Sequence, residues 1–293
     1  MSTIYPQYLV ESDWLEKHLQ DPNLRILDCT VSLKPNQEGI LTNVGREAWE
    51  ASHIPGSLFA DLSKELSDQK HSFPFMLPPA QQFEEAMSQY GIEAGKQVVL
   101  YDACKDQWAH IWAARLWWML RVYGFDQAAI LNGGLHKWTV EKRPVTKEVP
   151  TYPKANFVAK KRPTLIADKQ EVLNSLSQEE TCLINALSAE EHAGHKTRYG
   201  RAGRIPSSVN VPTGSLIDPK TKTYLPIENL RAQFKASGAL DKDKVITYCG
   251  GGIAASSDAF ILSLLGKSKV AVYDGSLLEW SADSEMPMEK DLG

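Results

Sequence analysis

The sequence predicts an α/β protein made of two tandem copies of one domain, each with a mainly parallel sheet flanked by helices. Short apolar runs alternate with helix-like stretches along the 293 residues, which is the pattern of parallel strands joined by crossover helices. The same order of signals also occurs in both halves of the chain, as expected for a duplicated domain. Hydrophobic residues make up 43% and charged residues 23%, as in soluble globular proteins.

Five pairs of segments support the duplication. Each half has a buried-strand pattern, an Ile-Pro motif followed by small residues, a second strand, a helical pattern, and a final strand that ends in a tryptophan motif. In order, the pairs are 24–29 with 181–187, 53–62 with 204–216, 97–103 with 244–250, 110–124 with 254–266, and 128–138 with 270–280.

A segment rich in proline and lysine, residues 143–163, separates the two copies. Such a composition is typical of an exposed linker. We therefore predict an N-terminal domain over residues 1–142 and a C-terminal domain over residues 164–293. Aligning the strand ends places Asp102 opposite Cys249, so the N-terminal copy is expected to be non-catalytic. Cys104 lies two residues beyond the matching position and is interpreted as an ordinary loop cysteine.

Composition and charge exclude several functions. A formal net charge of −4 argues against a nucleic-acid surface, and no apolar run is long enough to span a bilayer. The first residues lack the basic and then apolar pattern of a secretory signal. None of the four cysteines forms a CxxC pair. We therefore expect a cytoplasmic protein with reduced cysteines and without a structural metal site.

One cysteine stands where a thiol can react. The stretch CGGGIAA follows a predicted strand and precedes a helical pattern. Amide groups at a helix start attract negative charge, and glycines allow the backbone to curl around one anion. Such a cradle is expected to lower the thiol pKa and to stabilise a thiolate or a persulfide. The candidate nucleophile is Cys249, and the glycines of the candidate cradle are Gly250, Gly251 and Gly252.

Other interpretations of this stretch stay open at this point. A lone cysteine after a strand is often a small buried hydrophobic residue. The three glycines would also suit a tight turn or a phosphate loop. A Walker-type P-loop is excluded, because no Gly-Lys-Ser or Gly-Lys-Thr follows.

Taken together in this order, HIPGSLFADL, LWWMLRVYG, LNGGLHKW, the cysteine loop and YDGSLLEW resemble the tandem rhodanese-type sulfurtransferases. The resemblance covers nearly the whole chain. It implies two rhodanese-like domains, with the catalytic cysteine only in the C-terminal one. It also implies that the loop after this cysteine cradles the sulfur and binds the substrate, namely Gly250, Gly251, Gly252, Ile253 and Ala254. Cys249 would take sulfur from a donor, hold it as a persulfide, and pass it to an acceptor thiol, cyanide or a thioredoxin-like protein. No metal or organic cofactor is implied.

The resemblance slightly favours 3-mercaptopyruvate over thiosulfate as the donor. Mercaptopyruvate enzymes resemble one another in the pattern Cys-Gly-x-Gly-x-x-Ala, which CGGGIAA fits, although Gly251 stands where many of them have serine. They also place two arginines before the second Ile-Pro motif to hold the donor carboxylate. Arg198 and Arg201 are the candidates for one of these two positions, since a guanidinium fork suits a carboxylate, and the earlier position has an acidic residue or a histidine instead. The alternative is that both are solvated loop charges.

The resemblance also suggests a catalytic role for His53, which begins the first Ile-Pro motif. In mercaptopyruvate enzymes this histidine is placed to assist proton transfer. A histidine at the start of a turn more often caps or packs, and its counterpart in the second half is Arg204. Both interpretations are kept.

Two functions of other kinds were weighed. Cysteine phosphatases of the Cdc25-like kind share this fold but need the pattern Cys-x5-Arg to clamp a phosphoryl group. Ala255 occupies that arginine position, which argues against them. A non-catalytic rhodanese-like module for binding or sulfur sensing is the remaining alternative, and it would gain no sulfur from a donor.

Overall fold

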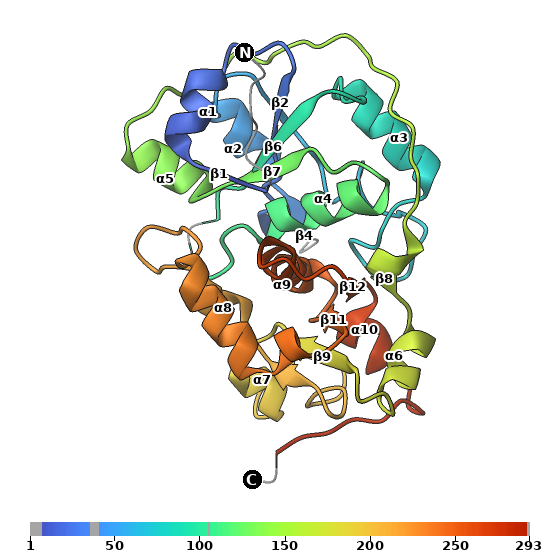
Figure 1. Ribbon diagram of the computed structural model, residues 1–293. Helices are drawn as coiled ribbons and strands as arrows, with labels where there is room; N and C mark the ends of the chain where they lie inside the picture. The colour runs from blue at the N-terminus through green and yellow to red at the C-terminus, as the bar shows by residue number, and fades with distance from the viewer. Residues whose placement is uncertain (1–7, 36–40, 105, 292–293) are drawn as a thin grey trace. The chain divides into compact units, whose positions relative to one another are not determined.

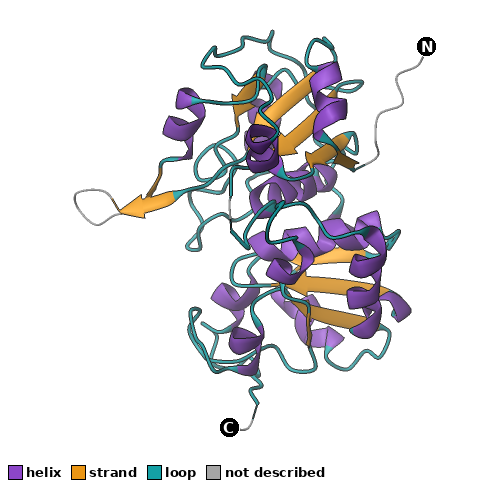
Figure 2. Ribbon diagram, turned by 90° about the vertical axis from the view of Figure 1, so that its left-hand side faces the viewer, coloured by secondary structure: helices purple, strands orange, loops and turns teal. Residues whose placement is uncertain are grey.

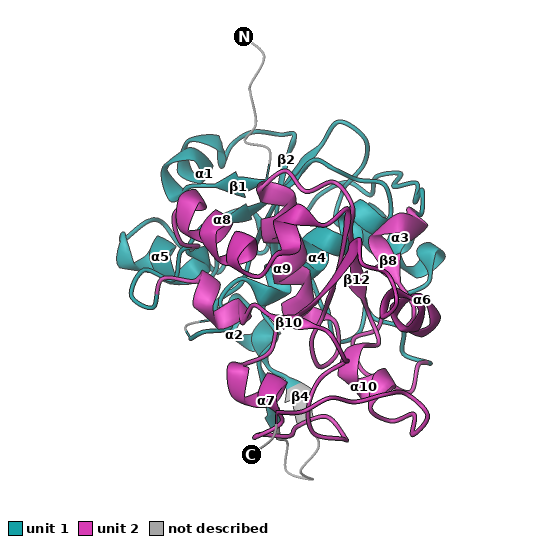
Figure 3. Cartoon of the chain, turned by 60° about the horizontal axis from the view of Figure 1, so that its bottom comes forward, with its two compact units in different colours: residues 1–70, 77–161, 219–223 teal, residues 71–76, 162–218, 224–293 magenta. Residues whose placement is uncertain are grey.

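The computed structural model describes residues 8–35, 41–104 and 106–291, and the chain forms two compact units (Figure 1). Unit 1 comprises residues 1–70, 77–161 and 219–223 (Figure 3). Unit 2 comprises residues 71–76, 162–218 and 224–293. The main division thus falls near the end of the predicted linker, and each unit also includes a short segment from the other half of the sequence.

Much of the predicted linker is held against unit 1 by hydrogen bonds. The amide of Ala155 donates to the carbonyl oxygen of Ser88 at 2.9 Å, and the amide of Phe157 donates to the Ser88 hydroxyl at 3.0 Å. Further along, the amide of Lys160 donates to the carbonyl oxygen of Tyr123 at 2.9 Å. The Phe157 side chain is buried. Although most of its side chains face solvent, this segment therefore has a fixed path over unit 1.

Unit 1 is built on a five-stranded parallel sheet in the order β1-β7-β6-β2-β5. Its strands are β1 (Leu9–Val10), β2 (Leu24–Asp28), β5 (Ser57–Phe59), β6 (Gln97–Tyr101) and β7 (Ala128–Leu131), and a separate antiparallel pair consists of β3 (Leu33–Pro35) and β4 (Leu41–Asn43). Its helices are α1 (Ser12–His18), α2 (Gly45–Ala51), α3 (Ala80–Gln89), α4 (Ile111–Val122) and α5 (Gly134–Val140). The central strands β2, β6 and β7 are buried along their whole length, which explains why apolar residues predominate in them.

Unit 2 has a second five-stranded parallel sheet, in the order β10-β9-β11-β12-β8. Its strands are β8 (Ile166–Ala167), β9 (Thr181–Asn185), β10 (Val209–Asn210), β11 (Lys244–Tyr248) and β12 (Val270–Tyr273). Its α-helices are α6 (Lys169–Ser175), α7 (Ala189–Ala193), α8 (Ile227–Ala236), α9 (Ile253–Leu264) and α10 (Ser276–Trp280), with 3-10 turns η1 (Pro163–Leu165), η2 (Thr213–Leu216) and η3 (Ala239–Asp241). Helices flank the strands of this sheet (Figure 2).

The two sheets have the same topology, which confirms the predicted duplication. Written from β5, the order β5-β2-β6-β7-β1 corresponds strand by strand to β10-β9-β11-β12-β8. Side chains repeat as well. The Trp138 indole donates to the carbonyl oxygen of Pro144 at 2.7 Å, and the Trp280 indole donates to that of Pro287 at 2.8 Å. Both indoles are fully buried, so these tryptophans anchor equivalent turns in the two copies.

Helix α9 is almost entirely buried, which explains its composition of small and apolar residues. It packs against β11 and β12. The buried hydroxyl of Ser256 bonds back to the helix, where it donates to the carbonyl oxygen of Gly252 at 2.7 Å. The buried hydroxyl of Ser257 lies 3.4 Å from that of Tyr224. Within residues 8–35, 41–104 and 106–291, no helix is both long and apolar enough to cross a membrane.

Candidate active site

Cys249 lies at the carboxyl end of the central strand β11, directly before the loop that leads into α9. This edge of a parallel sheet is where α/β proteins place their ligand sites. Gly252 has a φ of +78° and serves as the N-cap of α9. A left-handed residue at this position needs glycine, since other residues carry a steric cost there. The loop turns tightly around the sulfur, and Cys249 is only 3% exposed.

Four backbone amides act on the Cys249 sulfur as hydrogen-bond donors and lower its pKa, those of Gly251, Gly252, Ala254 and Ala255. Burial acts more strongly in the opposite direction, because the thiolate loses its contact with water. The net result is a thiol pKa above its ordinary value. The predicted cradle is therefore present, but the expectation that it lowers the pKa of the free thiol overall is wrong.

Ser276, the first residue of α10, holds both ends of the cradle. Its hydroxyl oxygen accepts from the amides of Cys249 and Gly252, each at 3.1 Å, and its proton goes to the carbonyl oxygen of Tyr273 at 2.7 Å. Ser276 is fully buried and has a φ of +48°. This unusual backbone conformation is maintained by three hydrogen bonds that fix the loop.

Ser276→Ala is expected to destabilise unit 2 and slow sulfur transfer. Two buried amides would lose their acceptor, which costs about 2–4 kcal/mol of unfolding free energy. Chemical denaturation would measure the loss. Ser256→Ala is the matched control. The Ser256 hydroxyl is lost, but the carbonyl oxygen of Gly252 still accepts from the backbone amide of residue 256 at 3.3 Å. Equal stability of the two variants would contradict an anchoring role for Ser276.

Tyr199 covers the cradle. A Cβ atom built on Gly250 would overlap the phenol end of the Tyr199 ring. Burial is the main reason why the pKa of Tyr199 is raised to about 12, and the charge of Cys249 adds to it. The phenol is thus a neutral group beside the reactive sulfur. Gly250 is required here by the close approach of the ring, since its own φ is not in the left-handed region.

The two predicted donor-binding arginines differ in their surroundings. Arg198 is 48% exposed, and its Nε lies 3.3 Å from a carboxylate oxygen of Glu191. The guanidinium of Arg201 donates instead to the carbonyl oxygens of Ser281 at 3.0 Å, Trp280 at 3.2 Å and Asp283 at 2.6 Å. These contacts favour an architectural role for Arg201, which ties the chain after α10 to the loop before the second Ile-Pro motif.

His53 is fully buried in unit 1 and stacks on Trp49 with ring centroids 4.4 Å apart. Its Nδ1 lies 2.7 Å from the Trp49 carbonyl oxygen, and its Nε2 lies 3.1 Å from that of Glu148. Its backbone pairs with Thr146, just as that of Arg204 pairs with Glu289 in the other copy. Both ring nitrogens therefore face main-chain carbonyls, which favours the packing interpretation of this histidine.

Unit 1 has the same cradle, filled by a carboxyl group. Asp102 follows β6 as Cys249 follows β11. Its Oδ1 accepts from the amides of Cys104 and His110, each at 3.2 Å. Its Oδ2 accepts from those of Trp112 at 3.2 Å and Ala113 at 3.3 Å. His110 has a φ of +69° at the N-cap of α4, as Gly252 has at the N-cap of α9. In this copy the carboxyl group of Asp102 occupies the position of the sulfur and accepts from the amides of the cradle.

The remaining cysteines have none of this environment. Burial raises the pKa of Cys104, and the neighbouring Asp102 raises it further. Burial also raises the pKa of Cys29, and it raises that of Cys182 to about 11. All four cysteines are free thiols. Among these four cysteines, Cys249 is the one whose sulfur lies beside the amides at the start of a helix, those just before α9 and those in its first turn.

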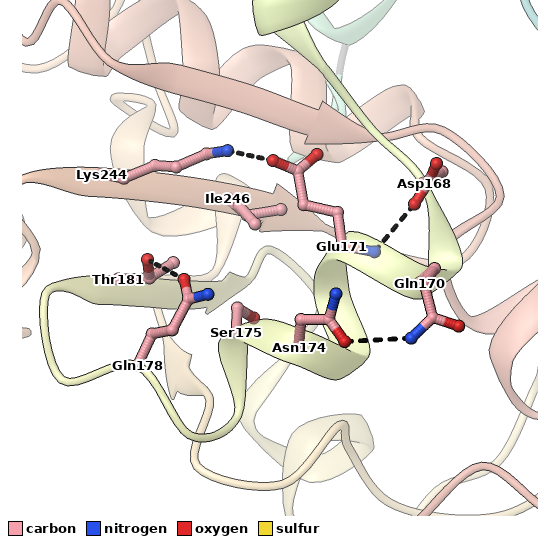
Figure 4. A pocket seen from close by; sticks show the side chains of 9 residues that line it. All are labelled: Asp168, Gln170, Glu171, Asn174, Ser175, Gln178, Thr181, Lys244 and Ile246. Carbon is pink, nitrogen blue, oxygen red and sulfur yellow. Dashed lines mark hydrogen bonds and ion pairs between the residues drawn. The ribbon is translucent and has the colours of Figure 1, made fainter.

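A pocket of about 320 Å3 opens elsewhere on unit 2, beside α6 (Figure 4). Its lining includes Lys244 and Thr181, the first residues of β11 and β9, and an ion pair joins Lys244 to Glu171. Cys249 lies at the other end of β11. This pocket is therefore not the candidate active site.

Sequence analysis did not identify Ser276 and Tyr199 beside the cradle, and it assigned no role to Glu191. Ser276 lies in the repeated YDGSLLEW motif, where the first copy has Gly134 with a φ of +52°. The matching glycine was the available signal for an unusual backbone at this position. No sequence signal placed Tyr199 over Gly250, because that contact joins two loops about fifty residues apart.

A duplicated parallel sheet with an amide cradle around one cysteine defines the rhodanese class of fold and site. Comparison with known families agrees, since the Rhodanese-like domain family matches residues 11–141 and 168–283. The chain belongs to the rhodanese family, and it is an enzyme of the rhodanese type.

Relatives extend over nearly the whole chain. The 3-mercaptopyruvate sulfurtransferase of Escherichia coli is 31% identical over 287 residues, which cover 96% of this chain and 98% of that protein. The thiosulfate sulfurtransferase of Rattus norvegicus is 31% identical over 280 residues, covering 93% and 91%. The sulfur carrier protein TtuD of Thermus thermophilus is 30% identical, covering 99% of both.

Among solved structures, the crystal structure of SseA from Escherichia coli, described as a 3-mercaptopyruvate sulfotransferase with the rhodanese fold, superposes with a TM-score of 0.79. It is 29% identical in sequence and covers 92% of this chain and 99% of that one. Both the sequence and the fold of this chain are therefore similar to those of tandem rhodanese proteins from end to end.

Proposed function

We propose that this protein transfers a sulfur atom from a small donor to a thiophilic acceptor through a persulfide on Cys249. The observation that carries the proposal is the convergence of four backbone amides on this one sulfur at the start of α9. An anion formed there is stabilised by fixed dipoles that need no reorganisation. The sulfurtransferase names of the relatives support the same chemistry.

The transfer takes two steps. In the first, the Cys249 thiolate attacks the outer sulfur of thiosulfate, the S–S bond of the donor breaks, and sulfite leaves with the electron pair. With 3-mercaptopyruvate the C–S bond breaks instead, and pyruvate leaves as an enolate that takes up a proton. In the second step, an acceptor thiolate or cyanide attacks the outer sulfur of the persulfide and releases the Cys249 thiolate.

The proposed donor is 3-mercaptopyruvate in preference to thiosulfate. No basic residue stands between Cys249 and Ser256 to attract a dianion, and relatives named for both donors align over the whole chain. Arg198 is the proposed anchor for the donor carboxylate, because it lines a small pocket together with Tyr199. Arg201 lines the same pocket, but its contacts with main-chain carbonyls support a structural role.

The N-terminal copy is proposed to be non-catalytic. Asp102 fills its cradle, and burial keeps the pKa of Cys104 high. A role for His53 in proton transfer stays a prediction, and the carbonyl contacts of both its ring nitrogens support packing instead.

The acceptor and the location complete the proposal. We propose a small thiol, cyanide or a thioredoxin-like protein as the acceptor, and one relative is named a sulfur carrier protein. A cytoplasmic location is proposed because all four cysteines are free thiols, as is usual in a reducing compartment.

Intact-protein mass spectrometry tests the proposal directly. The protein is incubated with thiosulfate, and separately with 3-mercaptopyruvate, without an acceptor. The expected result is a gain of one sulfur atom, which disappears when an acceptor thiol is added. If neither donor adds sulfur, the protein is a binding or sensing module with the fold of the enzymes.

Persulfide formation is expected to accelerate as pH rises. Because burial raises the pKa of Cys249, the thiolate fraction near neutral pH is small and grows about tenfold per pH unit below that pKa. Thiosulfate is the donor to use, since its own charge is constant over this range. Initial rates from about pH 6.5 to about pH 9 would measure the effect. A plateau already below neutral pH would mean that the amide cradle outweighs burial.

A further inference from the structure

An acidic side chain lies beside the proposed donor anchor. Glu191, on α7, is buried with 5% exposure. One of its oxygens, Oε2, accepts from the Ser188 amide at 3.3 Å and from its hydroxyl at 2.8 Å, which completes a capping box. The other, Oε1, lies 3.3 Å from Nε of Arg198. This is an ion pair by distance, although the two groups are not aligned as a hydrogen bond.

Tyr199 lies between these two charged side chains and the cradle of the reactive sulfur. Burial is the main cause of the raised pKa of Tyr199; the charge of Cys249 and the carboxylate of Glu191 raise it further, whereas the positive charge of Arg198 lowers it. The three groups act on the same ring, and that ring lies against Gly250 of the cradle. An anionic donor placed for attack by Cys249 would therefore feel both Arg198 and Glu191.

The other charges around this pocket are basic. Lys196 and Arg201 also line it, but Lys196 is exposed to solvent and Arg201 is bound to main-chain carbonyls. Among the described residues that line the pocket, Glu191 is the only acidic one. Its buried carboxylate is poorly screened by salt, in contrast to a surface charge.

We infer that Glu191 is a specificity-determining residue, which lowers the affinity of the site for anionic sulfur donors by holding the guanidinium of Arg198. The inference rests on the proposed function and deepens it. A guanidinium that already lies beside a carboxylate offers an incoming carboxylate or sulfonate less net positive charge. The site is thereby biased against donors in proportion to their negative charge, so thiosulfate, a dianion, is disfavoured more than the monoanion 3-mercaptopyruvate.

The test measures donor binding at equilibrium and does not depend on sulfur transfer. Titration calorimetry with 3-mercaptopyruvate is carried out on proteins that carry Cys249→Ser, so that the donor is not consumed. Adding Glu191→Gln is expected to lower the Kd about threefold to fivefold, because glutamine keeps one carbonyl oxygen that can accept from Ser188 but carries no charge to hold Arg198. The same change is expected to lower the Kd for thiosulfate by a larger factor.

A cycle with Arg198→Met shows whether Glu191 acts through the arginine. Arg198→Met alone is expected to raise the Kd, and adding Glu191→Gln to it should have little further effect. Ser188→Ala is the matched control for capping. It weakens the start of α7 without changing charge, and it should lower thermal stability but leave the Kd unchanged.

Several results would overturn the inference. These are an unchanged or higher Kd in the folded Glu191→Gln protein, an equal gain with and without Arg198, or the same shift from Ser188→Ala. Sulfur uptake by the protein with Cys249 intact is measured in parallel by mass spectrometry. Absence of uptake would overturn the proposed function, while the binding cycle would still decide the role of Glu191.

Discussion

Cys249→Ser is expected to take up no sulfur from either donor and to lose sulfur-transfer activity by about 10³-fold or more. A serine hydroxyl is far less acidic than a thiol and does not form a persulfide. The fold should persist, because the hydroxyl is smaller than the thiol and can accept from the amides that now surround the sulfur. Mass spectrometry after incubation with the donor, together with circular dichroism, measures both parts of this prediction.

Cys104→Ser is the matched control for this variant. Cys104 follows the equivalent strand of unit 1, but the cradle there is filled by Asp102. Its replacement is expected to leave sulfur uptake and turnover unchanged. If Cys104→Ser abolished uptake and Cys249→Ser did not, the equivalence between Asp102 and Cys249 would be wrong.

Gly250→Ala is expected to reduce sulfur transfer at least about tenfold and to destabilise unit 2 by about 1–3 kcal/mol. The added methyl group would overlap the ring of Tyr199, so either the ring or the cradle has to move. The adjacent amide of Gly251 would shift with the loop and weaken its bond to the Cys249 sulfur. Steady-state kinetics and chemical denaturation on the same protein give both quantities.

Two further variants show whether the overlap with Tyr199 is the cause. Gly251→Ala places its methyl group 3.1 Å from Cδ1 of Leu278, an end of a flexible side chain, and is expected to cost much less. In a Tyr199→Ala background, Gly250→Ala should have almost no additional effect, because the ring is gone. If Gly250→Ala still abolishes activity in the Tyr199→Ala background, the overlap with Tyr199 is not the cause. The backbone of the loop would then be what requires glycine at this position.

The fold was predictable because its signals are local. The runs at 24–29 and 181–187 consist largely of apolar residues, and both form strands that are almost entirely buried. The repeated order of signals predicted two domains, and the two sheets have the same strand order. The linker was less predictable. Its composition indicates exposure, whereas the bond from the Lys160 amide to Tyr123 depends on a distant part of the chain.

The position of the candidate nucleophile was predictable for a similar reason. Strand, glycine-rich loop and helix follow one another directly, so the amides of a helix start must lie close to Cys249. Aligning the two copies also identified Asp102 as its counterpart, and both side chains lie on four amides. A local pattern therefore predicts which backbone groups surround the residue.

The sequence by itself thus determined the two sheets, the duplication and the loop that presents Cys249, because each depends on residues adjacent in the chain. Only the tertiary structure decided how strongly burial raises the pKa of that thiol, since burial depends on every element packed around it. It also placed Tyr199 against Gly250, paired Glu191 with Arg198, and bound Arg201 to the main chain. Long, charged or aromatic side chains on loops can contact several different partners. Which partner they contact depends on packing between segments far apart in the sequence.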